Sequence, residues 1–117
     1  MESVTLYKHK DETGALTTLT VGVGLSGDLV FNEGTFYPSL GSLKSREVDE
    51  YLIIRTGDFR MVAHQLDCST DPQALLSAVA ERAMREGIRT LDGAESLLTR
   101  LGIPSNRPEP WYTHNDD

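Results

Sequence analysis

A glycine-rich run at residues 22–27 (GVGLSG) is the first feature of this chain that could support chemistry, because it matches the G-x-G-x-x-G pattern of dinucleotide-binding loops. Such a loop works where it joins a strand to a helix, since the helix N-terminus receives the pyrophosphate. Here the following residues, 28–31 (DLVF), have the pattern of a strand. We therefore interpret the glycines as part of a tight or bulged hairpin, and we predict no cofactor and no cofactor-binding residue.

His64 and Cys68 are four positions apart, so on one helix they could offer two ligands to zinc. A closed zinc site needs four ligands and an open one needs three. The other histidines, His9 and His114, would have to converge from opposite ends of the chain. As a catalytic nucleophile, Cys68 would need a nearby base, and His64 is the only one the sequence places near it. We interpret the pair as a polar helix histidine beside a small buried thiol, and we predict no metal ligand and no catalytic residue.

Glu47, Asp49 and Glu50 form the densest cluster among the 18 carboxylates. A calcium loop would need regularly spaced oxygen ligands around a central glycine, which is absent. We expect these residues in or beside a loop, forming a solvated edge or a contact for cations on another protein. They are candidate partner-binding residues.

Trp111 and Tyr112 are two further candidate partner-binding residues, and they allow two interpretations. A lone tryptophan near a terminus often seals its own core, and this is the interpretation that the sequence favours. Exposed aromatic residues in an acidic chain are instead typical interface anchors. The sequence leaves both open.

The elements that would position these residues change character at residues 56–58 (TGD). Before this point the hydrophobic pattern alternates, which predicts strands near residues 4–9, 16–23, 29–31 and 50–55. Residues 36–37 could extend the third strand, whereas 39–49 have the composition of a loop or one irregular turn. The apolar run at 51–54 predicts a central strand that is covered on both faces.

After residue 58 the apolar residues recur at helical spacing. The three predicted stripes are Phe59, Val62, Ala63 and Leu66; Leu75, Leu76, Val79, Ala80, Ala83 and Met84; and Ala94, Leu97, Leu98 and Leu101.

Capping residues mark the ends of these predicted helices. Thr56 or Asp58 could cap the first helix, Asp71 before Pro72 suits the start of the second, and Asp92 with Glu95 has the spacing of a capping box for the third. Gly87 and Gly102 are placed as left-handed stops after the second and third helices, and Ile103 can fold back on Leu98.

The length of 117 residues and an apolar fraction of 38% predict one domain, residues 1–117. We expect an α+β fold with strands at about 4–55, helices at about 58–102 and a tail at 103–117. An antiparallel sheet of about four strands would be covered on one face by about three helices. The sequence has no apolar run of membrane-spanning length and no visible secretory signal, and its single cysteine suits a reducing cytoplasm.

The formal charge of −7 argues against nucleic acid as a partner, because phosphate binding needs clustered lysines and arginines. No part of the chain dominates this charge. It is typical of a soluble surface, and it would also suit an acidic face that steers a basic protein partner.

Several short motifs resemble a family of small, acidic, uncharacterised bacterial proteins. They are residues 4–11 (VTLYKHKD), 17–19 (TTL), 27–30 (GDLV), 33–34 (EG), 102–104 (GIP) and 111–112 (WY). The resemblance covers about the first 55 residues and the last helix turn. It implies a bacterial origin and a noncatalytic role, and it assigns no function to individual positions.

The sequence is therefore interpreted as a small cytoplasmic protein-protein interaction module, in the manner of an immunity or antitoxin-like inhibitor of a basic partner. Two alternatives remain open. One is a small enzyme whose polar residues converge only in three dimensions, and the other is a structural module that forms homo-oligomers through an edge strand or the Trp111 tail.

Overall fold

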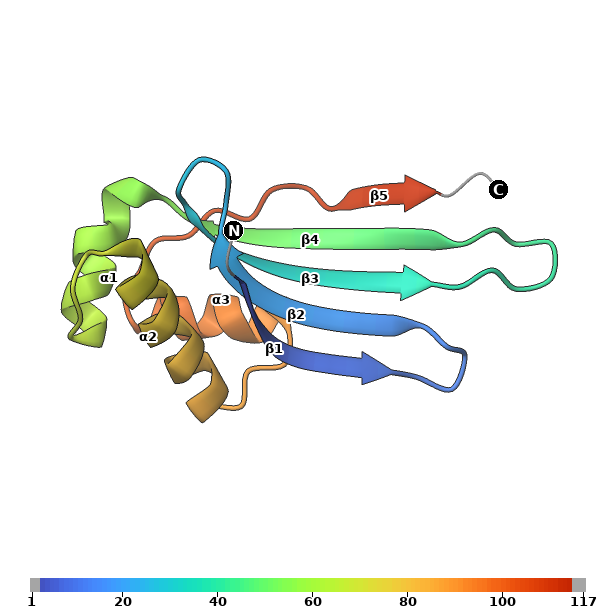
Figure 1. The fold of residues 1–117 in the computed structure, drawn as a ribbon, viewed down its shortest axis with the longest axis horizontal. Coiled ribbons are helices and arrows are strands. Elements are labelled where there is room, and N and C mark those ends of the chain that lie inside the picture. Colours follow the sequence, from blue (N-terminus) through green and yellow to red (C-terminus); the bar gives the residue numbers. More distant parts are fainter. Residues whose placement is uncertain (1–2, 115–117) are drawn as a thin grey trace.

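The computed structural model describes residues 3–114. Five strands form one antiparallel sheet in the order β1-β2-β3-β4-β5 (Figure 1). Along the chain, the helices come after the fourth strand and before the fifth. The elements are β1 (Ser3–Lys10), β2 (Leu16–Val23), β3 (Leu29–Tyr37), β4 (Arg46–Ile54), the 3-10 turn η1 (Thr56–Asp58), α1 (Phe59–Leu66), α2 (Pro72–Arg85), α3 (Leu91–Arg100) and β5 (Trp111–His114). The α+β class and the antiparallel sheet are as predicted. The strand count is five rather than about four, because the tail returns to pair with β4.

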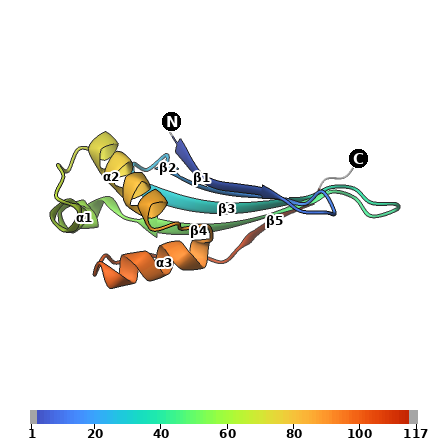
Figure 2. The same ribbon diagram turned by 90° about the horizontal axis from the view of Figure 1, so that it is seen from below.

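The molecule is elongated, with principal extents of 51 × 27 × 22 Å. All three helices gather at one end of the sheet, and the other end extends beyond them (Figures 1 and 2). α2 contacts β1 and β2, whereas α3 contacts β3 and β4. The helices therefore cover only part of one face, and the prediction of a covered face applies to the half nearest the β2–β3 turn.

The hydrophobic core lies between this half of the sheet and the helices. Alternate residues of the three inner strands supply its sheet side, namely Leu19, Val21, Leu29, Phe31, Leu52 and Ile54, all fully buried. Phe31 is among the largest fully buried side chains. The residues between them point to the opposite face, because successive side chains of a strand alternate. Ile53 is only half-buried for this reason, so the expectation that β4 is covered on both faces is wrong.

Most of the predicted helix boundaries are confirmed. The Asp71 side chain accepts a hydrogen bond from the Ala74 amide, and Pro72 opens α2. Gly87 and Gly102 follow α2 and α3 with φ of 68° and 70°, the left-handed geometry that glycine adopts without strain. Ile103 is buried and donates to the Leu98 carbonyl.

Three details of the helical half differ from the prediction. Thr90, rather than Asp92, caps α3 by accepting from the Gly93 amide. No side chain caps α1, because η1 precedes it and supplies a backbone connection instead. Met84 belongs to the predicted buried stripe of α2 but is 52% exposed.

The hairpin between β3 and β4 is longer than expected. β3 runs to Tyr37 and β4 begins at Arg46, directly opposite it. Beyond them, Leu40 and Leu43 exchange backbone hydrogen bonds around a turn in which Gly41 has φ of 60°. Residues 46–49 are therefore strand and not loop. Their sequence does not alternate between apolar and polar residues, because the helices of residues 3–114 do not cover this part of the sheet (Figure 2) and polar residues can occupy both of its faces.

The glycine-rich run forms a turn between two strands, as the sequence predicts. β2 ends at Val23, the Gly24 amide donates to the Asp28 carbonyl, and Gly27 has φ of 84°. β3 follows at once. The glycine-rich run therefore leads into a strand and not into a helix, so the strand-to-helix connection that the dinucleotide motif requires is not formed here.

Candidate partner-binding site

The face of the sheet opposite the helices carries the best candidate for a functional surface, and we call it the open face. Strand register assigns its residues, because directly paired residues of antiparallel strands point to the same side. Gly34 pairs with Asp49, which pairs with Trp111. In the next row Phe36 pairs with Glu47. These rows cross β3, β4 and β5 at the end of the sheet that extends beyond the helices.

An acidic and aromatic patch results, which we define as Phe36, Glu47, Asp49, Tyr51 and Trp111. Trp111 is 66% exposed and Phe36 is 38% exposed. The interpretation of Trp111 as a core residue, which the sequence favoured, is therefore wrong. Glu47 and Asp49 lie two apart on β4, so their carboxylates are neighbours on one face. The patch combines negative charge with exposed aromatic surface.

The Asp49 carboxylate has a defined position in this patch. The Asn32 amide Nδ2 donates to Asp49 Oδ1 at 3.3 Å and to the Glu50 carbonyl at 3.2 Å. Gly34 lies beneath the carboxylate, and a Cβ added at Gly34 would be 2.7 Å from Asp49 Oδ1. The bare glycine thus leaves the space that the carboxylate occupies.

Burial and the negative charges of the patch both act on the pKa of Tyr51. Burial raises the pKa of its hydroxyl, and the charges of Asp49 and Glu47 raise it further because they oppose a phenolate. The hydroxyl therefore stays protonated and can donate a hydrogen bond to a partner.

Glu50 and Tyr112, the other two predicted residues, point to the opposite face, which the helices occupy. Register places Glu50 opposite Glu33, and Glu33 accepts a hydrogen bond from the Leu91 amide at the start of α3. Tyr112 pairs with Val48 and is 63% exposed, because this half of the sheet lies beyond the helices. Three of the five predicted residues are thus brought together on the open face.

Arg107 is a residue that sequence reasoning missed. Its guanidinium binds Glu50 on β4 at 2.7 Å and also Asp92 and Glu95 on α3, at 2.6 and 3.1 Å. The hydrogen bonds that the guanidinium donates to Glu50 and then to Asp92 raise its pKa above the usual range. The sequence offered only a weak indication of this role, which is that Arg107 is the one lysine or arginine in an acidic, proline-containing tail.

Arg107 holds the segment that leads into β5. Just before it, Asn106 exchanges backbone hydrogen bonds with Ile53 at 2.8 and 2.9 Å. Pro108 and Pro110 then interrupt the ladder, because proline has no backbone donor. Pairing resumes at Trp111 opposite Asp49. Arg107 is therefore the side-chain clamp that positions the β5 part of the patch.

The candidates for metal or thiol chemistry do not converge. His64 is exposed on α1, and Cys68 is half-buried after its end. Burial raises the pKa of the Cys68 thiol, with a smaller contribution from Asp67, so the nucleophilic thiolate is disfavoured. Among residues 3–114, no three His, Cys, Asp or Glu side chains lie together as a metal ion would require. His114 ends β5, and its side chain lies outside the described part of the structure.

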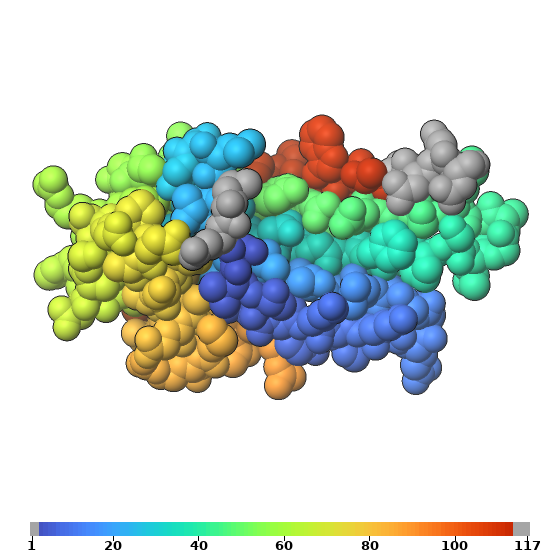
Figure 3. Space-filling model, viewed as in Figure 1, coloured from blue at the N-terminus to red at the C-terminus, as the bar shows by residue number. Residues whose placement is uncertain are grey.

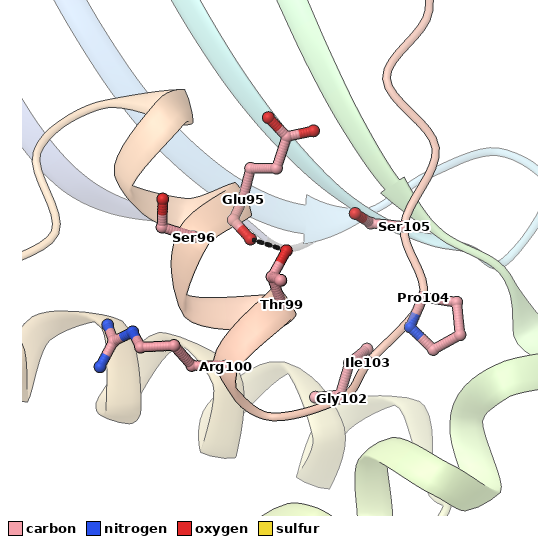
Figure 4. A pocket seen from close by; sticks show the side chains of 8 residues that line it. All are labelled: Glu95, Ser96, Thr99, Arg100, Gly102, Ile103, Pro104 and Ser105. Carbon is pink, nitrogen blue, oxygen red and sulfur yellow. Dashed lines mark hydrogen bonds between the residues drawn. The ribbon is translucent and has the colours of Figure 1, made fainter.

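A depression of about 750 Å³ lies beside the end of α3. Its lining includes Glu95, Thr99 and Arg100 (Figure 4), and these groups already have partners. Glu95 binds Arg107, the Thr99 hydroxyl donates to the Glu95 carbonyl, and Arg100 pairs with Glu86. Four further depressions of about 230 to 590 Å³ have no histidine in their linings either. None of these five depressions combines a histidine with a carboxylate in its lining.

Comparison with protein-family models, with curated proteins and with solved structures finds no match to this chain. In residues 3–114, no helix is both long and apolar enough to cross a membrane. The function therefore has to be inferred from the surface itself.

Proposed function

We propose that this chain is a noncatalytic protein-protein interaction module whose open face binds a basic region of a partner protein, in the manner of an immunity or antitoxin-like inhibitor. One observation carries the proposal. The register of β3, β4 and β5 gathers Glu47 and Asp49 with Trp111, Phe36 and Tyr51 on a sheet face that none of the helices in residues 3–114 covers (Figure 2).

Three physical arguments support a basic protein as the partner. The net charge of −7 raises the rate at which a cationic protein meets this chain. Exposed aromatic side chains supply the contact area that interface hot spots commonly use. Asp49 is already fixed by Asn32 and Gly34, so less conformational entropy is lost when it pairs with a cation.

Capture from cells with a charge-reversed variant tests the proposal. The tagged wild type would be compared with a double variant of the patch, Glu47→Lys with Asp49→Lys. A control double variant, Glu12→Lys with Glu81→Lys, changes exposed acids in the β1–β2 turn and on α2. Both double variants replace two acids with two lysines, so each changes the net charge from −7 to −7 + 4 = −3. Captured proteins would be identified by mass spectrometry.

We expect a basic protein that is retained by the wild type and the control variant at low salt and lost from the patch variant. With that protein purified, reversal of the patch should lower the association rate by about 10-fold or more, and the effect should shrink as salt is raised. A wild type that captures nothing at low salt, or a protein that both double variants retain equally, would contradict the proposal.

Gly34→Ala is expected to weaken the same interaction without changing any charge. The new methyl group would overlap the present position of Asp49 Oδ1, so the flexible side chain must move away from Asn32. We expect the affinity for the captured protein to fall about 3- to 10-fold, equivalent to about 0.7–1.4 kcal/mol. Because alanine suits a strand at least as well as glycine, the free energy of unfolding should change by less than about 1 kcal/mol.

Calorimetric titration of the Gly34→Ala variant measures this effect, and Thr18→Ala is its control. Thr18 is directly opposite Gly34 on β2, so it changes the same row of the open face without touching Asp49. Equal affinities of the two variants would show that the position of the carboxylate is unimportant.

A further inference from the structure

The two edges of the sheet differ in how well they are protected against pairing with another strand. β1 has a register shift between Thr5 and Tyr7, and it carries exposed lysines at positions 8 and 10. Bulges and lysines are the devices that keep an edge strand from pairing. β5, the other edge, has the sequence WYTH, with neither a lysine nor a proline. In residues 3–114, no strand pairs with its outer side.

The outer edge of β5 also adjoins the patch. Trp111 and Thr113 point to the open face, because they pair with Asp49 and Glu47. In Figure 3, β5 forms the upper rim of the molecule, with β4 beneath it. A strand added outside β5 would lie about 4.8 Å from it. Alternate side chains of that strand would therefore stand next to Trp111 on the open face.

Arginine is the side chain best suited to that position. Its guanidinium stacks on an indole ring, which is the strongest aromatic acceptor of a cation. Asp49 is the next residue of the same row, on the side of Trp111 away from the added strand, so its negative charge also attracts the guanidinium. An extended segment with a cation at every second residue would match both the ladder of β5 and the charge of the patch.

From this geometry we infer that the outer edge of β5 accepts an extended, basic segment of the partner protein as a sixth strand. The inference rests on the proposed function, and it specifies how the partner binds. Main-chain hydrogen bonds to β5 supply affinity, and alternate arginine or lysine side chains against Trp111 and Asp49 supply specificity.

Charge favours a partner protein over a second copy of this chain. Each copy of this chain carries a formal charge of −7, and Glu47 and Asp49 lie on β4 directly behind β5. Two copies paired through their β5 edges would therefore bring like charges towards each other, which is unfavourable. A basic segment reverses the sign of this interaction.

Defined peptides test the inference with the full-length protein. The probe is the capped peptide TRVRTRVR, which places arginine at every second position. The control TRPRTRPR has the same charge, but its prolines remove backbone donors and prevent a continuous strand. The peptide TEVETEVE tests the sign of the charge. Trp111 is the only tryptophan, so its fluorescence reports binding at the site, and hydrogen exchange of the backbone amides locates the added strand.

We expect TRVRTRVR to change the Trp111 emission saturably, to bind at least fivefold more tightly than TRPRTRPR, and to slow exchange in residues 111–113 but not along β1. Equal binding of the two arginine peptides would overturn strand addition and leave the proposed function standing. Binding of TEVETEVE as tight as that of TRVRTRVR would contradict the charge preference on which both rest. Protection along β1 alone, no binding of any peptide at millimolar concentration, or a mass that grows with protein concentration in light scattering would each overturn the inference.

Discussion

Replacing Phe31 with alanine should lower the free energy of unfolding by about 3–5 kcal/mol, the range for a phenylalanine lost from a packed core. Phe31 is completely buried near the start of β3, between the sheet and the helices. Its loss removes apolar surface from the core, and the surrounding side chains can fill the cavity only in part. For a domain of this size such a loss is a large fraction of the total stability.

Phe36→Ala on the same strand is the matched control. Phe36 is five residues further along β3, on the open face, and is 38% exposed. We expect its replacement to lower the free energy of unfolding by about 1–2 kcal/mol, because part of its surface stays in water and its loss leaves no enclosed cavity. Urea denaturation followed by circular dichroism measures both values. If Phe31→Ala fails to fold, Phe31→Leu can be measured instead, because leucine leaves a smaller cavity and should lower the free energy of unfolding by less.

The comparison of these two phenylalanines checks the central structural claim, that only one face of the sheet is covered. Equal costs at the two positions would mean that the open face is buried in solution, as it would be against a second copy of the chain. The proposed binding surface would then be occupied already.

Local sequence signals predicted the elements on the helix-covered side of the molecule. The alternation of Leu19 and Val21 marks β2, and the helical spacing of Phe59 and Val62 marks α1. Asp71 marks the start of α2 through its cap. These signals are present because each of these residues faces the buried core or caps the end of a helix. A core position requires an apolar side chain and a helix cap requires a hydrogen-bond acceptor, so both restrict the residue type.

The uncovered half of the sheet was harder to predict for the same physical reason. Residues 46–49 have no helix against either face, so neither face requires apolar side chains. The first residues of β4 are therefore mostly polar, and their composition resembles that of a solvated loop. β5 was hard to predict because its partner strand is distant in the sequence: Trp111 pairs with Asp49 (111 − 49 = 62 positions) and His114 with Arg46 (114 − 46 = 68 positions).

The candidate site was predicted by residue type but not by geometry. Glu47, Asp49 and Trp111 stood out as charged and aromatic residues, yet nothing local shows that Trp111 and Asp49 are cross-strand neighbours. Glu50 is adjacent in sequence to Asp49 but faces the helices, since neighbouring residues of a strand point to opposite faces. Gly34 contributes by lacking a Cβ where the Asp49 carboxylate lies, and only the register of the folded sheet brings these two residues together.

Arg107→Ala should lower the free energy of unfolding by about 1–2 kcal/mol and release β5 from the sheet. Arg107 and Glu50 are 28% and 30% exposed, so their charge-assisted hydrogen bond is partly shielded from water and stronger than a surface pair. Asp92 is 82% exposed and contributes less. Removal of the guanidinium also leaves three carboxylates facing one another without a cation, which adds a penalty beyond the lost bonds.

Arg85→Ala is the matched control for this prediction, because its pair with Glu81 on α2 is well exposed, with side chains 65% and 69% exposed. We expect a loss of less than about 0.5 kcal/mol there. Urea denaturation gives the two energies, and hydrogen exchange separates a general loss of stability from a local one. If Arg107 is the clamp on β5, the amides of residues 111–113 should exchange faster in Arg107→Ala by a larger factor than those of β2. If amide exchange is faster by the same factor throughout the sheet, Arg107 stabilises the fold as a whole and does not hold the edge strand. The β5 part of the binding surface would then be held by the four-residue ladder with β4 alone.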